Sequence, residues 1–169
     1  MKKVFALLTL AAALLCVSNN VNAQISVHAG FLNDIYGGDL DESESGFYAG
    51  ANYNFNAFSD FGIAPGVYVA SSTDRFDLRI PVLLNYHFNL SGPLGAKVFA
   101  GPQVNLGLSG DLYDAGCKKF GLGLNFGAGF CYEQFSLEFG YMLNFIDQSD
   151  ISGLEYKLNQ LTVGLGYNF

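Results

Sequence analysis

The sequence predicts an all-β fold: an eight-stranded antiparallel up-and-down transmembrane β-barrel, preceded by a cleavable signal peptide. Three observations support this prediction. Apolar residues recur at every second position in eight segments, one face of each segment carries no charge, and long and short connections alternate along the chain. A dyad repeat with short turns at one end and longer loops at the other is typical of outer-membrane barrels.

The composition excludes several classes of protein. With 16 Phe and 10 Tyr among 169 residues, the chain is too aromatic to be disordered. Its net charge of −7, with only eight Lys and Arg residues, argues against binding to nucleic acid, which needs basic side chains to neutralise phosphates. Only 14% of the residues are charged, whereas a soluble surface is typically about 25–35% charged. The length is that of one domain.

The N-terminal residues 1–23 have the pattern of a secretory signal peptide. Two lysines precede an apolar run over residues 4–17, and the small residues Val21 and Ala23 stand before the expected cleavage site. The run is too short for a transmembrane helix, which needs about 20 apolar residues. The sequence therefore predicts a barrel domain over residues 24–169.

Alternation with a period of two runs through that domain. From Phe76 to Phe88 every even position is apolar, and the odd positions between them include Asp77, Arg79 and His87. Because successive side chains of a strand point to opposite sides, each segment has one apolar face and one mixed face. The predicted strands are 25–31, 47–55, 61–69, 76–88, 94–108, 120–132, 135–145 and 161–169.

The connections between these strands alternate in length. Short turns are predicted over 56–60, 89–93 and 133–134, and long polar connections over 32–45, 109–119 and 146–155, with 71–74 as a short exception. All short turns then lie at one end of the barrel and the long loops at the other. This arrangement predicts a periplasmic end and a surface-exposed end.

A second regularity concerns aromatic residues. The second, fourth, sixth and eighth strands each end in two aromatic residues on the apolar face, at the end with the short turns. These pairs are Tyr53/Phe55, Tyr86/Phe88, Phe130/Tyr132 and Tyr167/Phe169. They predict an aromatic girdle at the periplasmic membrane interface. The alternative interpretation is the ordinary preference of aromatic residues for strands.

The distribution of charge predicts which face meets lipid. Within the predicted strands only Asp77, Arg79, Lys97 and Glu138 are charged, and all four lie on the mixed face together with most of the glycines. Glycine suits the crowded interior of an eight-stranded barrel. Four charges are too few for the exterior of a soluble, lipocalin-like barrel. We therefore expect the apolar face to point outward, in a closed barrel without free edges.

The four charges should form a polar network in the lumen, since buried charges need partners. We expect Lys97 to pair with Glu138, and Arg79 to pair with Asp77 in a second group nearer the outer rim.

Three prolines interrupt the predicted strands. Pro65, Pro81 and Pro102 each remove a donor from the ladder. We expect them at bulges or close to the loops.

No motif of an enzyme or cofactor site stands out. GxSxG, Walker, HExxH and CxxC patterns do not occur, so we predict neither catalytic residues, nor a metal site, nor a cofactor. His28 and His87 lie on the mixed face and are expected to pack in the interior. Cys117 and Cys131 are 14 residues apart, which along a strand is about 45 Å. Free thiols rather than a disulfide are predicted.

Charged residues cluster in the long connections. The first predicted connection contains five acidic residues. Their spacing is not that of a calcium-binding loop, so a solvated acidic loop is favoured over a cation site. The five acids are Asp34, Asp39, Asp41, Glu42 and Glu44. Lys118 and Lys119 are candidates for contact with anionic lipid headgroups or lipopolysaccharide.

Several stretches resemble one known family. DLRIPVLLNYHF (77–88), VFAGPQVNLGLSG (98–110) and the hairpin 120–145 resemble the outer-membrane β-barrel domain of the porin-family, PorT-like proteins of Gram-negative bacteria. Phe169 matches the aromatic residue with which such chains usually end. The resemblance implies insertion by the barrel assembly machinery, with Phe169 in the assembly signal. It implies little about activity, because the family is functionally mixed.

Taken together, these features favour a structural or surface-interaction role in the envelope, with a plugged lumen. The expected partners are outer-membrane lipid and lipopolysaccharide, the barrel assembly machinery, and a protein at the long loops. The alternatives are a narrow pore or an accessory component of a protein-secretion assembly. Further alternatives are a lipid-modifying barrel enzyme and a soluble ligand-binding barrel.

Overall fold

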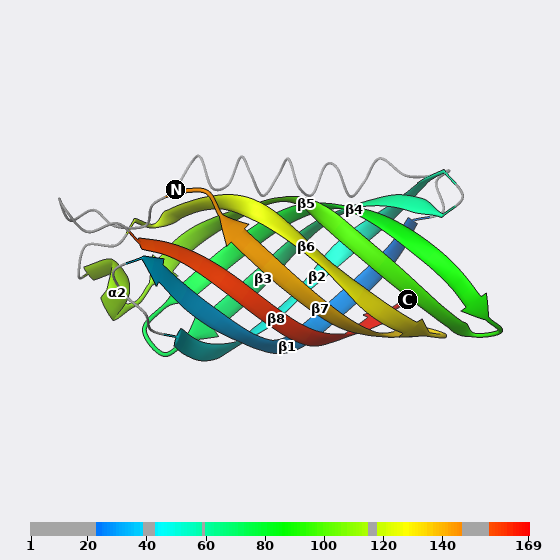
Figure 1. Cartoon of the computed structure of the whole chain (residues 1–169), viewed down its shortest axis with the longest axis horizontal. Coiled ribbons are helices and arrows are strands. Elements are labelled where there is room, and N and C mark those ends of the chain that lie inside the picture. Colours follow the sequence, from blue (N-terminus) through cyan, green and yellow to red (C-terminus); the bar gives the residue numbers. More distant parts are fainter. Residues whose placement is uncertain (1–22, 39–42, 59, 115–117, 147–155) are drawn as a thin grey trace.

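The computed structural model describes residues 23–38, 43–58, 60–114, 118–146 and 156–169. Eight antiparallel strands close into a barrel in which every strand pairs with its neighbours in sequence and β1 pairs with β8 (Figure 1). This architecture confirms the predicted fold class. The predicted signal peptide lies almost entirely outside the described residues.

The strands are 10 to 16 residues long. A single short helix, among the described residues, follows β5. The elements are β1 (Ala23–Gly38), β2 (Ser43–Phe58), β3 (Phe61–Ser72), β4 (Phe76–Ser91), β5 (Leu94–Ser109), α2 (Asp111–Asp114), β6 (Phe120–Tyr132), β7 (Phe135–Asn144) and β8 (Tyr156–Asn168). Figure 1 places α2 at the end of the barrel opposite the β4–β5 turn. No helix among the described residues is long and apolar enough to cross a membrane.

The first hairpin is longer than the sequence predicts. Residues 32–45 were expected as a loop, but β1 and β2 remain paired up to Ile35 and Ser43. Asp34 and Glu44 lie opposite each other in this extension, and Asp34 is fully buried. The prediction of a solvated acidic loop is therefore wrong for Asp34. Outside the lipid, strands can stay paired without an apolar outer face. Hydrophobic periodicity therefore identifies only the membrane-embedded part of each strand.

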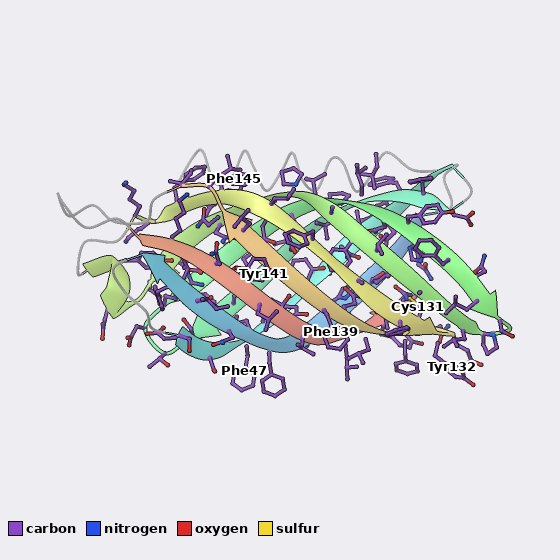
Figure 2. The ribbon with its side chains drawn as sticks, in the orientation of Figure 1. Phe47, Cys131, Tyr132, Phe139, Tyr141 and Phe145 are labelled. Carbon is purple, nitrogen blue, oxygen red and sulfur yellow. The ribbon has the colours of Figure 1, made fainter. Side chains whose placement is uncertain are left out.

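The apolar face points outward. Phe31 and Leu165 are each 65% exposed, whereas Asp77 on the other face is 1% exposed and Gln160 is 0% exposed. Figure 2 shows Phe47 and Tyr132 projecting from the outer surface of the barrel. This arrangement is the reverse of a soluble ligand-binding barrel, whose apolar residues would line the interior.

Glycines make room for the bulky side chains of the lumen. A Cβ on Gly164 would collide with the Tyr48 hydroxyl, and a Cβ on Gly127 would collide with the Phe99 ring. A narrow eight-stranded bore can be filled in this way because a ring from one strand lies over the bare backbone of another.

The prolines lie neither at bulges nor near loops. Pro65 pairs with Val82 in β4, and after two unpaired positions the β3–β4 ladder resumes in the same register at Tyr68. Pro81 likewise precedes a short gap in the β4–β5 ladder, again without a register shift. Pro102 lies opposite Leu124 in a continuous β5–β6 ladder. The expectation was wrong because a missing donor can interrupt a ladder locally without an extra residue.

Candidate functional site in the barrel lumen

Glu138 is the centre of a hydrogen-bonded cluster in the lumen. Its Oε1 accepts hydrogen bonds from Lys97 Nζ at 2.5 Å and Ser136 Oγ at 2.7 Å, and lies 3.0 Å from His28 Nδ1. These residues come from β5, β7 and β1, so the cluster joins strands that are not adjacent in the barrel. His28 is thus an interior residue that contacts Glu138, although the sequence analysis did not connect the two.

The strand register explains why Lys97 and Glu138 can meet. Lys97 lies opposite Gly129 of β6 on one side, and Glu138 lies opposite the same glycine on the other. Gly129 has no side chain between them. Two long side chains can therefore span one intervening strand and form an ion pair inside the barrel.

A second cluster, nearer the outer end, is built on Arg75. Its guanidinium donates from Nε and Nη2 to the two carboxylate oxygens of Asp34, at 2.9 and 2.6 Å. Its Nη1 lies 3.1 Å from Asp77 Oδ2. Gln160 donates a further hydrogen bond to Asp34, at 3.0 Å. The two-pronged contact uses the planar fork of the guanidinium, which matches a carboxylate.

The pairing expected between Arg79 and Asp77 is wrong. Asp77 contacts Arg75 instead, and Arg79 forms no ion pair with any described residue. Arg75 was overlooked because it lies between the predicted connection 71–74 and the predicted strand 76–88, and was assigned to neither. The spacing could have identified it, since residues 75, 77 and 79 share one face of an extended chain.

Tyr113 in α2 closes the outer mouth of the bore. Its hydroxyl donates to Asp77, and its ring occupies the space in front of Gly107. Lys119 Nζ lies 5.9 Å from the centre of the same ring. Burial raises the pKa of Tyr113, so the phenol stays neutral and able to donate. No sequence signal pointed to this residue.

Between the two clusters lies a cavity of about 50 Å³. Arg79 and Glu138 both line it, together with the rings of Tyr48, Tyr68 and Phe99. Arg79 is only 4% exposed. Within the described part of the chain, its Nε and Nη2 have no hydrogen-bond partner. The same holds for Nε2 of His28, a residue that also lines the cavity.

Three of the four aromatic pairs at the short-turn end are in ring contact. Tyr53 and Phe55 are 4.5 Å apart between ring centres, Tyr86 and Phe88 are also 4.5 Å apart, and Tyr167 and Phe169 are 4.9 Å apart, all edge to face. The remaining pair, Phe130 and Tyr132, is exposed on β6. Phe169 is held at the barrel wall, because its amide donates to the carbonyl of Ile25 at 2.9 Å.

Other predicted residues are placed only in part. Cys131 has a free thiol, but Cys117 lies outside the described residues, as do Asp39, Asp41 and Glu42. His87 lies opposite Lys97 in the β4–β5 ladder. Among the residues that the structure describes, no three His, Cys, Asp or Glu side chains are grouped so as to hold a metal ion.

Comparison with known proteins identifies the family. Residues 4–169 match the model of the family described as "Outer membrane protein beta-barrel domain". The chain belongs to this family. It is an outer-membrane protein with eight transmembrane strands, and the resemblance noted in the sequence is confirmed in this respect.

Solved structures support the same fold for this outer-membrane barrel. Neisserial surface protein A is 17% identical, with a TM-score of 0.55 over 86% of this chain and 97% of that one. The outer membrane protein OprG from Pseudomonas aeruginosa is 13% identical, with a TM-score of 0.51 over 88% and 97% of the two chains. None of the curated proteins matches by sequence.

Proposed function

We propose that this outer-membrane barrel has a structural and surface-interaction role, in which a plugged lumen holds the outer loops on a rigid rim. The observation that carries the proposal is the contact of Arg75 with Asp34 and Asp77. It ties β1 to the start of β4 across the bore, and Tyr113 adds the β5–β6 connection. Buried groups that satisfy one another in this way fix a single arrangement of the rim.

The same contacts argue against an open channel. Arg75, Asp34 and Asp77 are each at most 5% exposed, and the bore of an eight-stranded barrel is only wide enough for side chains to fill. We also propose that the barrel is not an enzyme. The histidine with a free ring nitrogen, His28, borders a cavity of about 50 Å³ inside the bore, which is far smaller than a lipid substrate.

The proposed partners follow from the two ends of the barrel. Lipopolysaccharide would surround the outer end, where Lys119 and Lys157 are exposed. A protein partner would bind the outer loops. Phe169, at the periplasmic rim, would serve in the signal read by the barrel assembly machinery, and the rim aromatic pairs would form an interfacial girdle. Residues 1–23 would be removed as a signal peptide during export.

The role is tested by comparing the wild type with a variant whose 147–155 connection is replaced by a short Gly-Ser turn. Crosslinking in intact cells should capture a partner or lipopolysaccharide with the wild type and lose it with the variant, while both remain heat-modifiable in the outer-membrane fraction. Equal capture by both proteins contradicts a role for this loop.

Three further measurements separate the alternatives. Steady conductance of the purified protein in planar bilayers would establish the narrow pore and contradict a plugged lumen. Secretion components among the captured proteins would establish the accessory role. An altered lipid A mass spectrum in a deletion strain would establish a lipid-modifying enzyme.

A further inference from the structure

Arg79 is a buried cation that has no counter-ion in contact among the residues that the structure describes. Its side chain points into the lumen from β4 and is 4% exposed, yet Nε and Nη2 have no hydrogen-bond partner. Leaving a buried charged group unpaired is strongly unfavourable, because the group loses its hydration without compensation. Something that the protein itself does not supply should occupy this position.

The carboxylates of the lumen are already engaged. Asp34 and Asp77 are bonded to Arg75, and Glu138 is bonded to Lys97. None of the three lies within ion-pair distance of Arg79. The charges of Asp34 and Asp77 act on Arg79 only over a longer range, and the positive charge of Arg75 opposes their effect.

Arg79 is one of the residues that line the cavity of about 50 Å³. Since one water needs about 10–15 Å³ by this measure, the space suits a halide-sized ion with one or two waters. Tyr68 also lines the cavity, and its phenol oxygen already accepts a hydrogen bond from Asn52 at 3.1 Å. The Tyr68 hydroxyl hydrogen therefore remains available to an acceptor.

We propose that the cavity beside Arg79 is a binding site for a small monovalent anion of halide size. The guanidinium of Arg79 is the charged ligand, and the Tyr68 hydroxyl is a neutral donor. A water next to the anion would satisfy the free Nε2 of His28. The site lies in the middle of the bore and needs no contribution from the outer loops, so it is independent of the surface role proposed above.

The direct test is crystallography of the wild-type barrel with bromide as the probe. Diffraction data collected at the bromine absorption edge should show an anomalous peak in the cavity, within hydrogen-bonding reach of the Arg79 guanidinium. Water alone in the cavity, with bromide absent or confined to the outer surface, overturns the proposal.

A solution experiment tests the same site through stability. The urea midpoint of unfolding should rise, and saturate, as chloride replaces gluconate at constant ionic strength. Arg79→Gln should lose this chloride-specific rise, whereas Lys157→Gln, which removes one exposed positive charge, should keep it. If Arg79→Gln does not fold, Tyr68→Phe should weaken the chloride dependence several-fold. An equal response in wild type and Arg79→Gln or Tyr68→Phe contradicts the assignment.

Discussion

Lys97 and Glu138 lie on either side of β6, each opposite Gly129, and their side chains meet in front of that glycine with 2.5 Å between Nζ and Oε1. The pair therefore depends on a residue that contributes no side chain. The same relationship makes the pair sensitive to changes at all three positions.

Removing one partner of this pair should be costly. Lys97→Met leaves Glu138 as a buried carboxylate bonded only to His28 and Ser136, and we expect a loss of about 3–5 kcal/mol in the free energy of unfolding. The double variant Lys97→Met, Glu138→Met should recover most of it, because no unpaired charge remains. Urea unfolding, followed by heat-modifiable migration, measures both. A double variant as unstable as the single one would show that the pair itself is strongly stabilising.

Asp34→Asn should loosen the outer rim. Asp34 receives two hydrogen bonds from Arg75. Replacing its carboxylate with a neutral amide keeps one acceptor oxygen but removes the second acceptor and the negative charge. We expect faster amide exchange in the outer parts of β1 and β2, with exchange near the short turns unchanged. Glu133→Gln, in the exposed β6–β7 turn, is the matched control and should alter neither region. Unchanged exchange in Asp34→Asn would separate the Arg75 cluster from rim rigidity.

Adding even a methyl group at Gly164 should destabilise the barrel. Its added Cβ would collide with the Tyr48 hydroxyl, so Gly164→Ala is expected to cost about 1–3 kcal/mol. Tyr48→Phe removes the hydroxyl, and the double variant should lose less than the sum of the two single variants. Gly92→Leu is a comparison variant without a steric collision, since a Cβ at Gly92 meets nothing within 4 Å. Any cost at this position comes from backbone strain, because its φ is 54°. Strict additivity of the Gly164 and Tyr48 changes would refute the collision.

A charged substitution on the lipid-facing surface should destabilise the barrel more the closer it lies to the middle of the bilayer. Leu165→Arg, in the middle of the apolar belt, should destabilise the barrel in lipid by about 2–4 kcal/mol, whereas Leu90→Arg, near the β4–β5 turn, should cost about 0–1 kcal/mol. The two leucines are comparably exposed, at 65% and 55%. Reversible unfolding in liposomes measures the difference. Equal costs would contradict the placement of the membrane-embedded belt.

Much of the fold could be predicted from alternation, because each residue's side of the strand follows from its parity. The sidedness of Phe31, Asp77 and Gly164 follows from this rule. The ends of the strands did not follow, since β1 and β2 stay paired after the apolar pattern stops at Phe31 and Phe47. Hydrogen bonds between the two strands hold this extension, and such bonds cannot be recognised from the amino-acid composition.

Only some members of the candidate site, and none of the contacts around Arg79, could be predicted from the sequence. Parity places Arg79 in the lumen, but its partners depend on the stagger between strands, which a single sequence does not reveal. In the structure Asp77 pairs with Arg75, and Arg79 lines a cavity instead. Tyr113 reaches the cluster from α2, an element that the sequence analysis treated as loop.

By itself, the sequence determined that this protein is a closed barrel with its apolar face toward lipid, because an alternating pattern without charge on one face has no other stable arrangement in a membrane. The tertiary structure decided which buried charges meet and which one stays unpaired. Those contacts join strands that are distant along the chain, and a shift of register by two residues would preserve every inward face while exchanging every partner.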